Sequence, residues 1–156
     1  MNVDKHIANE LTSIIKSNLP KFTQLKSVAD STWDKQGKFP YIFIFMPEEI
    51  DASYHYEDSS ILDSKQTINI AAYIGFKAPT DALKAGLSQE QYWELANEVK
   101  KGFRGMVLSP YSDTDEKVEF DPIKYAGKQI VNDNGQGVGL GVVHFQLTAK
   151  VRVLRV

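Results

Sequence analysis

Residues 54–58 gather groups that could carry chemistry. His55 lies between two tyrosines there, and the carboxylates of Glu57 and Asp58 follow. A histidine near carboxylates can bind a metal ion or transfer protons. A metal site needs several converging ligands, however, and the other two histidines are His6 and His144. We therefore interpret Tyr54–Asp58 as an exposed acidic turn, and keep a small ligand-binding domain or enzyme that uses this region as the alternative function.

A second candidate is a run of alternating glycines from Gly135 to Gly141. A dinucleotide fingerprint starting at Gly135 needs glycine at position 140, and one starting at Gly137 needs it at position 142. Those positions are Leu140 and Val142, and the run precedes a predicted strand, whereas phosphate binds at a helix N-terminus. We interpret the run as a hairpin tip or a strand edge with one face free of side chains, and predict no cofactor.

The remaining catalytic signals are weak. The chain has no cysteine, which excludes thiolate zinc sites, cysteine nucleophiles and disulfides. None of its serines stands in a Gly-x-Ser-x-Gly elbow. Carboxylates cluster at Glu48–Glu49 and Asp113–Glu116, but such runs in polar loops are usually solvated. We therefore predict a protein that is not an enzyme and holds no metal.

Hydrophobic periodicity predicts the elements that would position any site. Apolar residues recur every three or four positions from 3 to 19, which indicates a helix that ends at Pro20. Residues 41–46 form an apolar run between two prolines, typical of a buried strand, and residues 67–76 alternate as a half-buried strand. Between them, residues 48–64 are interpreted as a strand that continues into an acidic loop.

The second half contains another helix and a strand pair. Ser88-Gln89-Glu90-Gln91 resembles a capping box, so this helix is predicted to start at residue 89 and to keep helical spacing to Val107. Residues 111–122 are predicted to be an exposed loop, and 125–131 a strand. The turn residues 132–135 then lead into a strand that alternates to Val153. The core is expected to include the following residues: Leu11, Ile15, Ile44, Ile70, Leu95, Val99, Phe145 and Leu147.

Together these elements predict one α+β domain over residues 1–156, a mostly antiparallel mixed β-sheet with two main helices packed on it. The formal charge of −2 disfavours general nucleic-acid binding. No apolar stretch is long enough to span a membrane, and the N-terminal residues do not resemble a signal peptide. We therefore expect no nucleic-acid or membrane partner, and a cytoplasmic location.

Opposite charges collect in two regions. Residues 48–65 hold six carboxylates and one lysine, whereas the last seven residues hold three cations and no carboxylate side chain. Such patches could meet between neighbouring copies in a head-to-tail contact, with the glycine-rich hairpin reaching a neighbour. Both patches could equally be ordinary solubilising surface. The candidate subunit interface comprises Glu48, Glu49, Glu57, Asp58, Gly137, Gly139, Lys150 and Arg152.

The order of these elements, over nearly the whole chain, resembles the tail terminator (tail-completion) proteins of long-tailed bacteriophages and prophages. The resemblance rests on the helix ending at Leu19-Pro20, the strand entered through Phe39-Pro40, the alternating strand at 67–76, the helix around Tyr92–Leu95 and the final strand. It implies a homohexameric ring that caps the tail tube and joins it to the head connector. It also implies a place in the host cytoplasm during assembly and in the virion tail afterwards, and offers no catalytic residues. An adaptor of a contractile injection system is a related alternative.

Overall fold

Two long antiparallel strands, β4 (Asp63–Lys77) and β8 (Val138–Val153), form the centre of the structure. The computed structural model describes residues 2–24, 39–46, 51–53, 63–77, 85–133 and 138–153. The two strands pair continuously from Asp63 opposite Arg152 to Lys77 opposite Val138. Both strands alternate apolar and polar residues over most of their length, so pairing them places Ile68, Ile70, Phe145 and Leu147 on one face of this ribbon.

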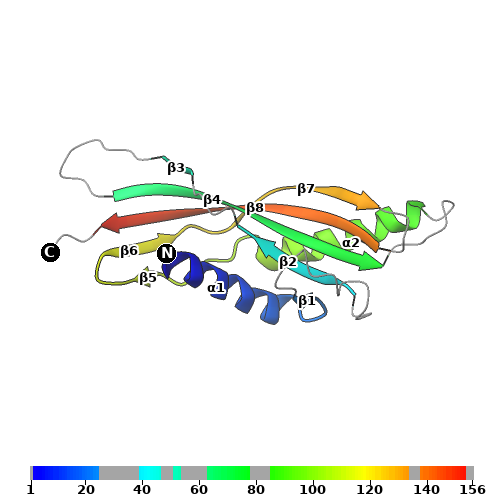
Figure 1. Cartoon of the computed structure of the whole chain (residues 1–156), viewed down its shortest axis with the longest axis horizontal. Coiled ribbons are helices and arrows are strands. Elements are labelled where there is room, and N and C mark those ends of the chain that lie inside the picture. The colour runs from blue at the N-terminus through cyan, green and yellow to red at the C-terminus, as the bar shows by residue number, and fades with distance from the viewer. Residues whose placement is uncertain are drawn as a thin grey trace.

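Shorter strands extend the sheet on both sides of this ribbon (Figure 1). On the β4 side lie β2 (Tyr41–Phe45) and β3 (Asp51–Ser53), both antiparallel to it, and β1 (Thr23–Gln24) pairs in parallel with β2. On the β8 side lie β6 (Glu116–Phe120) and β7 (Lys124–Asp133), and β5 (Tyr111–Ser112) pairs with β6. One parallel pair in an otherwise antiparallel sheet confirms the predicted fold class.

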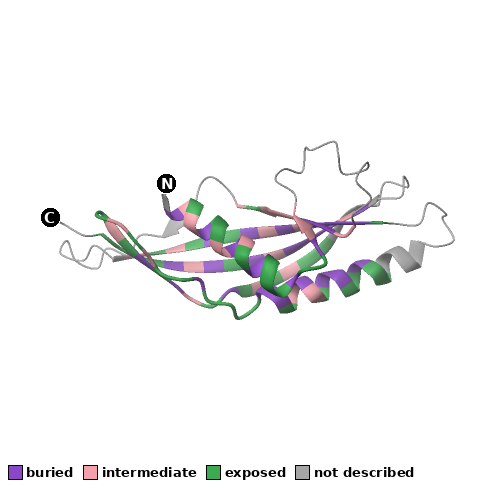
Figure 2. Cartoon of the chain, turned by 90° about the horizontal axis from the view of Figure 1, so that it is seen from below, coloured by how far each residue is buried: buried purple, intermediate pink, exposed green. Residues whose placement is uncertain are grey.

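Helices α1 (Asn2–Asn18) and α2 (Ala85–Phe103) follow one another along the length of the sheet (Figures 1 and 2). Their C-terminal ends meet, because Leu19 packs against Gly102 and Asn18 donates a hydrogen bond to the Gly102 carbonyl at 2.8 Å. No helix among the described residues is long and apolar enough to cross a membrane.

One buried cluster joins both helices to one face of the sheet (Figure 2). The helices contribute residues such as Leu11, Ile15 and Val99, and the central strands contribute their alternate side chains. Seven of the eight predicted core residues are buried. The exception is Ile44, which is only partly buried and packs against the cluster from β2.

Two predicted boundaries of the second helix are wrong. The helix begins at Ala85, so Ser88 lies inside it, because a capping signal is a local preference that one more helical turn overrides. It ends at Phe103, because Gly105 takes a positive φ of 81°, which terminates a helix. Met106 and Val107 therefore lie outside the helix and are exposed.

The predicted exposed loop at 111–122 is also wrong, because it contains the hairpin β5–β6. Val118 and Phe120 are buried, while Glu119 between them is exposed and lies opposite Lys150 of β8. The exposed face of this short strand carries charged residues, and a short charged segment is easily interpreted as a solvated loop. For this reason the sequence predicts a loop here. Of the strand predicted within 48–64, the structure describes β3, and residues 54–62 lie outside the described part.

Candidate functional site

The structure places three of the predicted interface residues. Gly139, Lys150 and Arg152 all belong to β8. The remaining five, and the Tyr54–Asp58 segment, lie outside the described residues: Glu48, Glu49, Glu57, Asp58 and Gly137.

Gly139 is buried within its own chain, and its assignment to a subunit interface stays a prediction. A Cβ at this position would overlap the ring of Phe76, its cross-strand partner on β4. A Cβ at Gly141 would likewise overlap the ring of Tyr92 from α2. The glycines therefore allow two aromatic rings, 6.0 Å apart between centroids, to lie directly on the β8 backbone. This packing accounts for glycine at positions 139 and 141 of the run without a ligand.

The Tyr92 hydroxyl anchors α2 to the sheet. It donates toward two backbone carbonyl oxygens, that of Gln129 on β7 at 2.8 Å and that of Val142 on β8 at 3.0 Å. Burial raises the pKa of Tyr92 to about 12, since the phenolate would lose its solvation there. The neutral hydroxyl thus acts as a structural donor.

Lys150 and Arg152 lie on the face of the sheet opposite the core and are exposed. Lys150 lies opposite Lys65 of β4 and Glu119 of β6, and its Nζ is 3.4 Å from Oδ1 of Asp121. Arg152 lies opposite Asp63 and Lys117. Part of the predicted acidic region, the start of β4, therefore lies next to the basic strand inside one chain.

These residues belong to a larger surface that the sequence does not reveal, which we call the polar sheet face. Its members alternate with core residues along three neighbouring strands and at the start of β7. Neither helix covers it among the described residues. It comprises Lys65, Thr67, Asn69, Lys117, Glu119, Lys124, Gln146, Thr148, Lys150 and Arg152.

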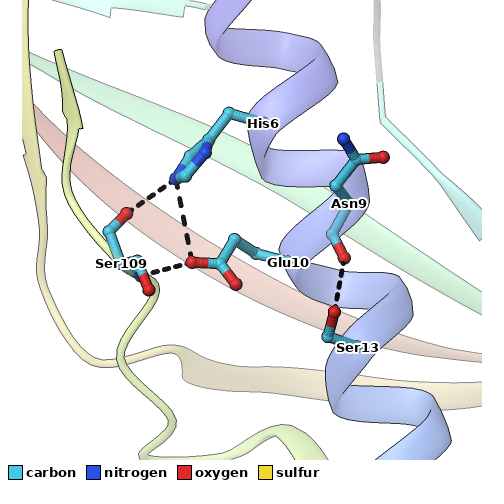
Figure 3. Close-up of polar contacts among 5 residues, drawn as sticks. All are labelled: His6, Asn9, Glu10, Ser13 and Ser109. Atoms are coloured by element: carbon cyan, nitrogen blue, oxygen red, sulfur yellow. Dashed lines mark hydrogen bonds and ion pairs between the residues drawn. The ribbon is translucent and has the colours of Figure 1, made fainter.

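A second polar cluster joins α1 to the segment after α2 (Figure 3). His6 Nε2 lies 2.7 Å from the Ser109 carbonyl oxygen, and the Ser109 backbone N–H donates to Glu10 Oε1 at 2.7 Å. The His6 ring also lies against Phe120 and Tyr111. More than ninety residues separate the two partners in sequence, so no local pattern indicates this contact.

The chemistry of this cluster is structural. A serine, a histidine and a glutamate meet, but His6 contacts the backbone carbonyl of Ser109, not its hydroxyl, so no activated nucleophile results. Hydrogen bonds from Ser109 lower the pKa of Glu10, and the proximity of His6 adds to this shift. The carboxylate therefore acts as an acceptor that fastens residues 109–111 to α1.

Carboxylates at the β5–β6 turn serve a similar local purpose. The carboxylate of Asp113 accepts hydrogen bonds from the Tyr111 hydroxyl and from the backbone N–H groups of Asp115 and Glu116. These bonds lower the pKa of Asp113, whereas burial and the neighbouring carboxylates raise the pKa of Glu116. In the part of the chain that the structure describes, no three acidic or histidine side chains converge to hold a metal ion.

Comparisons with known proteins identified no similar protein. No protein-family model matches the chain, and no curated protein is significantly similar to it.

Proposed function

We propose that the protein is a virion assembly protein of a long-tailed bacteriophage or prophage. It resembles a tail terminator, and six copies form a ring that caps the tail tube and joins it to the head connector. It acts by binding and has no catalytic role. The homo-oligomer, the tube protein and the connector are its partners.

The observation that carries this proposal is the exposed polar sheet face. Its five cations lie on one side of a two-layer arrangement whose other side holds the helices. A chain that presents different surfaces on two sides is suited to head-to-tail contacts, which close into rings or grow into filaments. The order of helices and strands along the chain supports the same family.

The chemistry of the described groups also favours binding. Among the described residues, two groups that resemble a ligand or catalytic site make internal contacts. Gly139 and Gly141 lie beneath aromatic rings, and His6 and Glu10 hold Ser109. These contacts support a role in which surfaces, not reacting side chains, carry the function.

The mass in solution tests the proposal directly. Light scattering over a dilution series should give about six times the chain mass of 17.6 kDa, and negative-stain images should show rings with a central opening. The same measurement should be made with short tail tubes of the matching phage, which the ring should cap at one end. A single chain under all these conditions, with tubes left uncapped, would contradict the proposal.

Elemental analysis distinguishes the proposed assembly role from the alternative, an enzyme or ligand-binding domain that uses Tyr54–Asp58. The purified protein should hold no stoichiometric transition metal, because three histidines and no cysteine are a poor ligand set. About one zinc, iron or manganese per chain, lost in the His55→Ala variant, would favour the enzyme that uses Tyr54–Asp58.

A further inference from the structure

We draw no further inference here: the strongest candidate, the surface patch on the side of the sheet away from the helices where exposed Phe45 of β2 borders the polar sheet face, has cationic and acidic residues side by side in its strand register, and nothing in the structure shows what covers it.

Discussion

The ring of Tyr92 lies against the backbone of Gly141, at the place where a Cβ atom would stand. The tyrosine comes from α2 and the glycine from β8, so this contact sets how closely the helix approaches the sheet. The hydroxyl of the same ring reaches the carbonyl oxygen of Val142, the next residue of β8. One aromatic side chain therefore combines close packing with a hydrogen bond.

Gly141→Ala should destabilise the fold, because the added methyl group overlaps the Tyr92 ring and the helix must shift. We expect a loss of about 1–3 kcal/mol in the free energy of unfolding, measured by urea denaturation. In a Tyr92→Leu background the same substitution should cost less, since the ring is gone. Equal costs in the two backgrounds would show that Tyr92 does not limit this position.

Tyr92→Phe should remove the donor to the carbonyls of Gln129 and Val142, at a cost of about 1–2 kcal/mol near neutral pH. It should also change the alkaline stability. The folded-state pKa of about 12 exceeds the ordinary value of 10.0, so this stabilisation is complete below pH 10 and is lost as the pH rises toward 12. Unfolding free energies measured over this range should fall less steeply for Tyr92→Phe. Parallel slopes for the two proteins would contradict the assignment.

Glu10→Gln should weaken the attachment of residues 109–111 to α1. The pKa of Glu10 is lowered from 4.5, so the ionised group stabilises the fold above that pH and the contribution disappears as the pH falls through the folded-state pKa. We expect a loss on the order of 1 kcal/mol at neutral pH that shrinks in acid. Glu94→Gln, on the exposed side of α2, is the control, compared at concentrations below the assembly midpoint. An unchanged difference between pH 7 and about pH 3 would exclude the charge as its source.

Leu95→Ala should test the packing of α2 on the sheet. Leu95 is 7% exposed within the buried cluster, so its truncation should cost about 2–5 kcal/mol. Met106→Ala, at a residue that is 36% exposed after the end of the helix, should cost less than about 1 kcal/mol. Thermal or urea denaturation compares the two. Similar costs for both would mean that α2 does not pack by this face.

The sequence by itself determined the parts of the fold that depend on local periodicity. Alternation along residues 67–76 and 143–153 predicts two half-buried strands, and the apolar stripe of residues 3–19 predicts the first helix. Each of these patterns reflects a single element that buries one face, so the physical cause lies within a few neighbouring residues. The absence of cysteine likewise follows from the sequence alone, and it excludes disulfides, thiolate zinc sites and cysteine nucleophiles.

Only the tertiary structure decided which surfaces come together. It pairs Lys150 with Glu119 and Lys65, seats Tyr92 on Gly141, and brings His6 to a carbonyl 103 residues away. It also shows that the charged segment at 116–120 is a strand with one buried face, and that the glycines serve internal packing. The pairings depend on the register between strands and on contacts between distant residues, which local periodicity does not specify.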